Sequence, residues 1–179
     1  MYRLFKLRAS KNKVAVNLYN ALVKQARLPV FYATGAVPDT PNGRYDMIMI
    51  HAFLLLHRLK RDRGVTQEIG QAVFDVMFQD MDKNLREMGA GDVGVSHRIK
   101  DMAKAFYGRI AVYEDGLNRS DGGLESAIKR NVYRNSSVAN EQINWLCNYI
   151  RNQTVSLASQ STDALLNGKL EFSKPSHTN

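Results

Sequence analysis

The strongest pattern in the chain is a helical repeat of hydrophobic side chains over residues 66–88. At about 100° per residue, the hydrophobic side chains of its second half share a sector about 140° wide. These side chains are Val73, Phe74, Met77, Phe78, Met81, Leu85 and Met88. Charged and amide side chains line both flanks, so the segment predicts an amphipathic helix. Dense charge around a methionine-rich stripe indicates a surface that meets another polypeptide.

A glycine-rich turn follows this helix. Gly89 and Gly91 predict its end, because glycine readily takes the left-handed backbone of a helix C-terminus. Ser96 is a suitable N-cap for a next helix over 96–117. One seam of that helix carries Ile99, Met102, Phe106, Ile110, Tyr113 and Leu117. Tyr107 falls off the seam, and we expect it to be partly exposed.

The remaining patterns are also helical. Helices are predicted over 13–28, 45–61, 123–133 and 137–166, the last with a small, polar second half that can form a separate helix. Residues 29–45 hold three prolines and two glycines and predict a long irregular loop. No segment alternates like a strand. The fold class is therefore all-α: a bundle of about six helices with a long irregular loop between the first two.

The helix predicted over 45–61 contains the apolar run MIMIHAFLLL. Ten residues are too few to cross a bilayer, so we expect a central buried helix. His51 lies within it, where a satisfied core histidine is commoner than a ligand. The length of 179 residues suits one domain. We divide it into a basic arm (1–12), a helical domain (13–166) and a flexible tail (167–179).

The net charge of +8 is concentrated at the N-terminus. Residues 1–30 hold seven basic side chains and no acidic one, whereas the other 149 residues hold 18 basic and 17 acidic side chains. Such an arm is attracted to the phosphates of RNA or of anionic lipids. A solvated, disordered start is the alternative. The residues of the proposed lipid- or RNA-binding arm are Arg3, Lys6, Arg8, Lys11 and Lys13.

Enzyme and cofactor sites find little support. GAGDVG at 89–94 matches a dinucleotide fingerprint but follows a helix instead of the required strand. The acidic run from Asp80 fails as a calcium loop, because its sixth and twelfth positions are Leu85 and Gly91. The histidines lack metal-ligand spacing, and Cys147 lies in an apolar segment that suits a buried thiol. We expect no catalysis, no cofactor and no metal.

Two long segments, 38–59 and 71–113, carry a family resemblance. The first is PDTPNGRYDMIMIHAFLLLHRL, and the second contains DMD at 80–82, LRE at 85–87, G-x-G-D at 89–92 and FYGR at 106–109. In combination they resemble the ubiquinol–cytochrome c chaperone family, the assembly factors for cytochrome b of respiratory complex III. The resemblance covers roughly residues 13–150.

The resemblance implies a non-enzymatic protein. Mitochondrial members bind newly made cytochrome b near the ribosomal exit tunnel until haem is inserted, together with a small helical partner. The short start looks like a bacterial member, for which we expect a cytoplasmic location peripheral to the inner membrane (the matrix side in a eukaryote) and no binding to DNA. The alternative is an adaptor for the ribosome, RNA or an anionic membrane surface, acting through the basic arm.

The polar residues of the matching motifs are the candidates for client or partner binding. They are Arg44, His51, Asp80, Asp82, Arg86, Glu87, Asp92, Tyr107 and Arg109. We expect Arg86, Glu87 and Tyr107 to line one client-facing groove. Two structural alternatives stay open: Asp82 can simply pair with Arg86 at i,i+4, and Asp92 can simply fix the turn.

Overall fold

Helices form all the regular structure in the part of the chain that this computed structural model describes, residues 2–89, 91–134 and 136–175. Side chains are described from residue 10 onward, except that of residue 93. No strand occurs among these residues, and the helices pack around one core. The prediction of an all-α, single-domain fold is confirmed.

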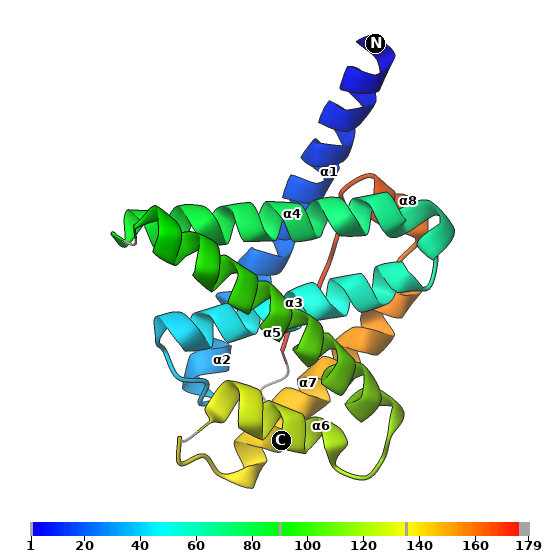
Figure 1. Cartoon of the computed structure of the whole chain (residues 1–179). Coiled ribbons are helices and arrows are strands. Elements are labelled where there is room, and N and C mark those ends of the chain that lie inside the picture. The colour runs from blue at the N-terminus through cyan, green and yellow to red at the C-terminus, as the bar shows by residue number, and fades with distance from the viewer. Residues whose placement is uncertain (1, 90, 135, 176–179) are drawn as a thin grey trace.

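The helices, in chain order, have the following bounds (Figure 1). They are α1 Tyr2–Ala26, α2 Val30–Ala33, α3 Pro41–Lys60, α4 Arg63–Glu87, α5 Asp92–Asn118, α6 Gly123–Ile128, the π-helix η1 Lys129–Tyr133, α7 Asn140–Ser159 and α8 Thr162–Leu166. Helices α4 and α5 form a long hairpin. Helix α3 crosses the middle of the molecule, α6 lies at the bottom of the view, and α7 runs from behind α6 up to α3.

Helix α3 is the centre of the core, as its apolar run predicted. It packs against α1, α4 and α7, and nearly every side chain from Met47 to Leu55 is buried. Its start is fixed by Thr40, whose hydroxyl accepts a hydrogen bond from the Gly43 nitrogen at 3.1 Å. A Cβ atom at Gly43 would lie 1.9 Å from the carbonyl oxygen of Pro38, so only glycine fits this approach.

The hydrophobic stripe of α4 faces this core, which corrects its interpretation as a surface for another polypeptide. Met77 is fully buried, and Met81 and Leu85 are nearly so. The stripe packs against α1, α3 and α5, because one hydrophobic face on a long helix is satisfied within the chain. Met88, just past the end of α4, is 66% exposed.

Helix α1 begins eleven residues earlier than predicted. The basic arm expected over 1–12 is helical from Tyr2 and continuous with the predicted first helix. Ala15, Leu18 and Leu22 are buried, whereas the N-terminal half projects beyond the other helices (Figure 1). The arm and the domain therefore differ in how they pack against other helices and not in secondary structure.

Other boundaries differ by a few residues. The long loop contains α2, whose Phe31 is buried in the core. Helix α4 begins before Thr66, and the buried Thr66 hydroxyl donates to the carbonyl of Leu59. Helix α5 begins at Asp92 and not at Ser96. The predicted helices over 123–133 and 137–166 are each divided, the second where Ser161 caps α8.

The segment after α8 is packed, although we expected a flexible tail from residue 167. Leu170 is 8% exposed, and Ser173 exchanges hydrogen bonds with the Gln153 side chain. Gly168, at φ +75, turns the chain into this segment. Among the described residues, no helix has the length and hydropathy needed to cross a membrane.

Candidate functional site

The turn between α4 and α5 gathers several of the motif residues. Gly89 closes α4 with φ +86, a left-handed conformation that favours glycine. Across this turn the Arg86 guanidinium joins two carboxylates: its Nε donates to Asp82 at 2.6 Å, and its Nη1 donates to Asp92, the first residue of α5. We call Asp82, Arg86, Met88 and Asp92 the hairpin tip.

The hairpin tip is an open surface. The side chain of Arg86 is 45% exposed and that of Asp92 is 88% exposed. The hydrogen bonds that Arg86 donates to Asp82 and Asp92 raise the pKa of Arg86, so the arginine stays charged. The exposed Met88 thioether lies next to these charges in sequence. The tip thus offers a flexible apolar side chain beside fixed charges, which suits contact with another polypeptide.

Tyr107 lies away from the hairpin tip, which corrects the prediction that Arg86, Glu87 and Tyr107 line one groove. Its side chain is 58% exposed, and its ring lies 5.4 Å from the ring of Phe74. Phe74 precedes Arg86 by twelve residues, about 18 Å along α4 and about 120° around it. Glu87 lies on the flank of α4 opposite Arg86 and is within 3.8 Å of Lys83. The three side chains therefore do not line one groove.

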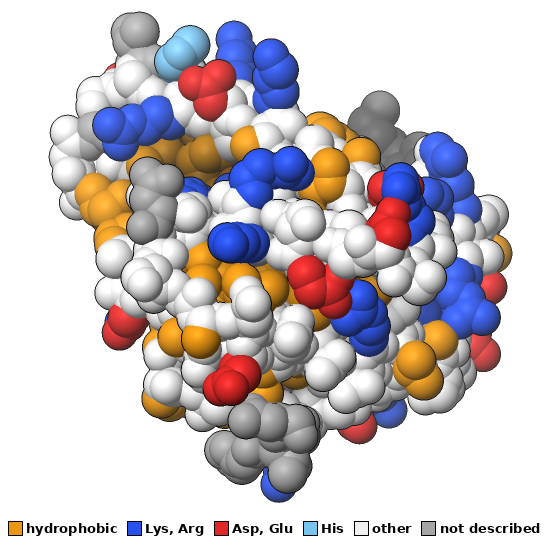
Figure 2. Space-filling model, turned by 90° about the horizontal axis from the view of Figure 1, so that it is seen from below, with side chains coloured by type: hydrophobic (Ala, Val, Ile, Leu, Met, Phe, Trp, Pro, Cys, Tyr) orange, Lys and Arg blue, Asp and Glu red, His pale blue; other side chains and the backbone are white. Residues whose placement is uncertain are grey.

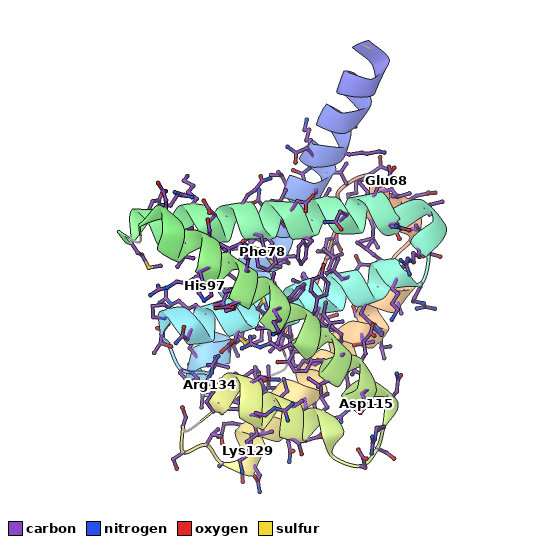
Figure 3. The ribbon with its side chains drawn as sticks, viewed as in Figure 1. Glu68, Phe78, His97, Asp115, Lys129 and Arg134 are labelled. Carbon is purple, nitrogen blue, oxygen red and sulfur yellow. The ribbon has the colours of Figure 1, made fainter. Side chains whose placement is uncertain are left out.

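Arg109 belongs to a cluster around a buried carboxylate. Its Nη1 donates to Asp46 at 2.6 Å, and Arg134 contacts the same carboxylate at 2.7 and 3.0 Å. Asp46 is 1% exposed, and burial raises the pKa of its carboxyl, whereas the Arg134 and Arg109 guanidiniums oppose that shift. The cluster joins α3, α5 and the end of η1, where Figure 3 labels Arg134. Arg109 therefore holds helices together.

Two further motif residues make local contacts. The Tyr19 hydroxyl of α1 donates to Asp80 at 2.7 Å, and burial together with this bond raises the pKa of Tyr19. Asp80 therefore ties α4 to α1. Arg44, in the first turn of α3, donates to Asp39, which precedes the helix, at 2.6 Å; both side chains are exposed. Asp80 and Arg44 are not brought together with the hairpin tip.

His51 is enclosed in the core, as expected for a histidine within an apolar helix. Its Nδ1 lies 2.7 Å from the carbonyl oxygen of Met47, and its Nε2 lies 2.7 Å from the hydroxyl of Tyr149. The side chain has no exposed surface, and burial lowers its pKa to about 4. The ring is therefore neutral, and nothing outside the protein touches it in this conformation.

Sequence reasoning missed three residues that hold this arrangement. Asp46 carried a signal, since a lone carboxylate in an apolar helix has to be paired. Arg134 carried none, because its partner lies 88 residues away and its own backbone has φ +49, which non-glycine residues rarely adopt. Arg58 is buried and donates to the carbonyls of Leu157 and Gln160, which caps the end of α7.

The structure describes the side chains of only some residues of the basic arm. Those of Arg3, Lys6 and Arg8 lie outside the described part of the structure. Lys11 pairs with Glu68 of α4, and Lys13 is exposed. On the underside of the molecule, Lys and Arg are spread among Asp and Glu, with hydrophobic side chains visible between them (Figure 2). The excess of basic side chains is in the sequence of residues 1–30, which hold seven basic residues and no acidic one.

Potential catalytic and metal-binding groups are few in the described residues. Cys147 is fully buried, and burial raises the pKa of its thiol to about 12, so it is not a nucleophile at neutral pH. No group of three His, Cys, Asp or Glu side chains lies close enough to hold a metal ion in residues 2–89, 91–134 and 136–175.

Known proteins match this chain over most of its length. The family model described as ubiquinol-cytochrome C chaperone matches residues 33–172. The match extends past residue 150, where the resemblance found in the sequence ended, and includes α7, α8 and the segment after them.

Two related proteins, from mouse and frog, agree with the family model. Ubiquinol-cytochrome c reductase complex assembly factor 1 of Mus musculus is 25% identical over 170 residues, and its counterpart in Xenopus laevis is 24% identical over 157. These alignments cover 93% and 87% of this chain, but 58% and 78% of the relatives. The chain thus spans 58% of the length of the mouse protein.

A solved structure gives the same answer for the fold. The crystal structure of the Cbp3 homolog from Brucella abortus superposes with a TM-score of 0.86 and 34% identity, covering 99% of each chain. The family model alone covers well over half of the chain. The chain therefore belongs to the ubiquinol–cytochrome c chaperone family.

Proposed function

We propose that this protein binds newly made cytochrome b and holds it during biogenesis of the ubiquinol–cytochrome c reductase complex. The observation that carries the proposal is the family match over residues 33–172, which includes the hairpin tip and the core that supports it. The mouse and frog relatives are named as assembly factors of that complex. The role is one of binding and not of catalysis, at the surface of the membrane that receives the client.

We place the contact with the client at the hairpin tip. Arg86 and Asp92 are the motif residues there with exposed charged groups, and Met88 adds exposed apolar surface. Arg109 and His51 are not part of the tip, because both are paired inside the fold. A hydrophobic membrane segment needs a covering surface until it is inserted, and methionine adapts to such surfaces at low cost.

Co-purification tests this proposal. The tagged protein is recovered from its own cells in gentle detergent, and the recovered peptides are identified by mass spectrometry. Cytochrome b peptides enriched over other membrane proteins of equal abundance are the expected result. Recovery of cytochrome b at the level of those other membrane proteins would remove the proposed client.

The second candidate function is an adaptor for a phosphate-bearing surface, either ribosomal RNA or anionic lipid. It is favoured by the projecting half of α1, whose sequence carries five basic residues and no acid over residues 1–13 (Figure 1). Binding of this kind falls steeply as salt is raised, because it releases counterions. Replacing Arg3, Lys6 and Arg8 by Gln should abolish ribosome or vesicle binding, and unchanged binding would exclude the arm.

A further inference from the structure

The segment after α8 is held by glutamine side chains in an unusual way. Residues 169–173, which we call the strap, run antiparallel to α7. The Gln160 amide donates to the Glu171 carbonyl and accepts from the Glu171 nitrogen at 3.1 Å. The Gln153 amide makes the same pair of bonds with Ser173, at 2.8 and 3.0 Å. Gln153 lies within α7, and Gln160 directly follows its last residue, Ser159.

These contacts imitate the pairing of two strands. Each glutamine offers one donor and one acceptor to one residue of the strap, as a neighbouring strand would. Gln25 of α1 adds a third amide, which donates to the Ser173 carbonyl at 3.3 Å. All these bonds go to the backbone of the strap. These backbone bonds by themselves do not depend on the side chains of the segment that lies there.

The inward side chains of the strap enter the aromatic part of the core. Leu170 is 8% exposed, and the Phe172 ring meets the His51 ring edge to face at 5.2 Å. The rings of Phe31 and Tyr149 lie next to His51, at 5.3 and 5.7 Å. Leu170 and Phe172 point inward while Glu171 and Ser173 are exposed, which is the alternation of an extended strand.

We propose that the groove under the strap, between α1, α3 and α7, is a binding site for an extended peptide segment of the client with an aromatic side chain. The strap is its tethered occupant, and a client segment binds by displacing it. The groove supplies backbone pairing through Gln153 and Gln160 and an aromatic pocket at His51. This inference rests on the proposed chaperone function, because the client is the source of the competing segment.

Displacement is a competition with a tethered segment. The strap is joined to α8 by a short connection through Gly168, so its effective concentration at the groove is on the order of millimolar. A client segment therefore succeeds when it is itself held nearby, for example by the hairpin tip. The groove then stays closed in the absence of a client, which keeps its aromatic floor from water.

A reversible crosslink tests whether the strap has to leave. The hydroxyl oxygens of Ser156 and Ser173 lie 2.6 Å apart, so the double variant Ser156→Cys/Ser173→Cys can be locked by oxidation and released by dithiothreitol. The single variant Ser156→Cys is the matched control, since it cannot close this crosslink, and native Cys147 is buried. The probe is a fluorescent peptide with the sequence of residues 167–175.

We expect the reduced double variant to bind the probe at least about tenfold more tightly than the oxidised one, and the control to show no difference. Phe172→Ala in the full chain weakens the strap and should bind the probe more tightly than the unsubstituted chain. A probe with Ala in place of the phenylalanine should lose this binding. Equal binding by locked and released protein, or no binding to the Phe172→Ala chain, would overturn the groove.

Capture of cytochrome b by the same proteins separates this inference from the proposed function. If the released form captures cytochrome b and the locked form does not, the groove is the site where the client enters. If both forms capture it equally, the groove is not used by the client and the inference is wrong, whereas the chaperone function stands. If neither form captures cytochrome b although the released form binds the probe, the proposed chaperone function for cytochrome b is wrong.

Discussion

Two arginine–carboxylate clusters of this protein share a bond length and differ in burial. Arg86 meets Asp82 at 2.6 Å at the hairpin tip, and Arg109 meets Asp46 at 2.6 Å in the interior. The carboxylate side chain is 37% exposed in the first cluster and 1% exposed in the second. An exposed pair gains little stability, whereas breaking a buried pair leaves a charge without compensation.

The difference assigns different tasks to residues that the sequence presents alike. Both arginines lie in the family motifs, at LRE and FYGR. The buried one fixes α5 against α3 and the end of η1. The exposed one has a charged surface that a partner can reach. A motif residue is therefore a candidate for client contact only after its burial is known.

Removing the buried carboxylate is the largest expected effect. Asp46→Asn leaves Arg109 and Arg134 without a counter-charge, and we expect it to lower the free energy of unfolding by about 3–5 kcal/mol. The matched variant Asp82→Asn removes the exposed carboxylate and should cost less than about 1 kcal/mol. Urea unfolding followed by circular dichroism measures both. Equal losses would mean that burial does not separate the two clusters.

The next largest expected effect is a pH dependence of the free energy of unfolding that arises from His51. His51 has a pKa of about 4 in the folded protein and an ordinary value of 6.5, so the unfolded chain binds the extra proton between these values. Stability from this group is full above pH 6.5 and falls as the pH drops toward 4, by about 3 kcal/mol in total.

The variant His51→Gln isolates that contribution, because the carboxyl groups titrate alike in both proteins. Unfolding free energies of the two proteins are measured at pH 7 and at pH 4.5. The loss on acidification should be smaller in the variant by about 2–3 kcal/mol. An equal loss in both proteins would show that His51 is not kept neutral by the core.

Gly89 and Gly91, which lie between Arg86 and Asp92, should show smaller effects on stability. Gly89 has φ +86, whereas Gly91 has φ −69, and a Cβ atom at either one meets nothing within 4 Å. Gly89→Ala should lower the free energy of unfolding by about 1 kcal/mol through backbone strain alone. Gly91→Ala should be close to neutral. A larger loss in Gly91→Ala than in Gly89→Ala would contradict the geometry of the turn.

The sequence predicted the fold well where periodicity reports burial. The stripe of α4 and the apolar run of α3 were predicted to be helical, and both are. The pattern could not tell whether the α4 stripe faces this chain or another one, because a buried face and an interface have the same spacing. Met77 and Met88 belong to one stripe, yet only Met88 is exposed.

The candidate site was harder to predict because its parts are joined over long distances. The i,i+4 pair of Asp82 and Arg86 follows from helix geometry, and it is present. The link from Arg109 to Asp46 spans 63 residues, and no local pattern reports it. The strap was missed for the same reason: a position at the chain terminus predicts mobility, and only the fold brings Gln153 and Gln160 beside the strap.

Two exposed arginines test whether the hairpin tip contacts the client. Arg119 at the end of α5 bonds to Asp115 and Asp121 on the surface, much as Arg86 bonds to Asp82 and Asp92. Because both arginines are exposed, Arg86→Ala and Arg119→Ala should each shift the melting temperature by less than about 2 °C.

The measurement is the amount of cytochrome b recovered with each tagged variant in gentle detergent, relative to the unsubstituted protein. We predict that Arg86→Ala lowers the recovery at least about fivefold, whereas Arg119→Ala leaves it unchanged. Equal recovery with both variants would contradict the assignment of client contact to the hairpin tip.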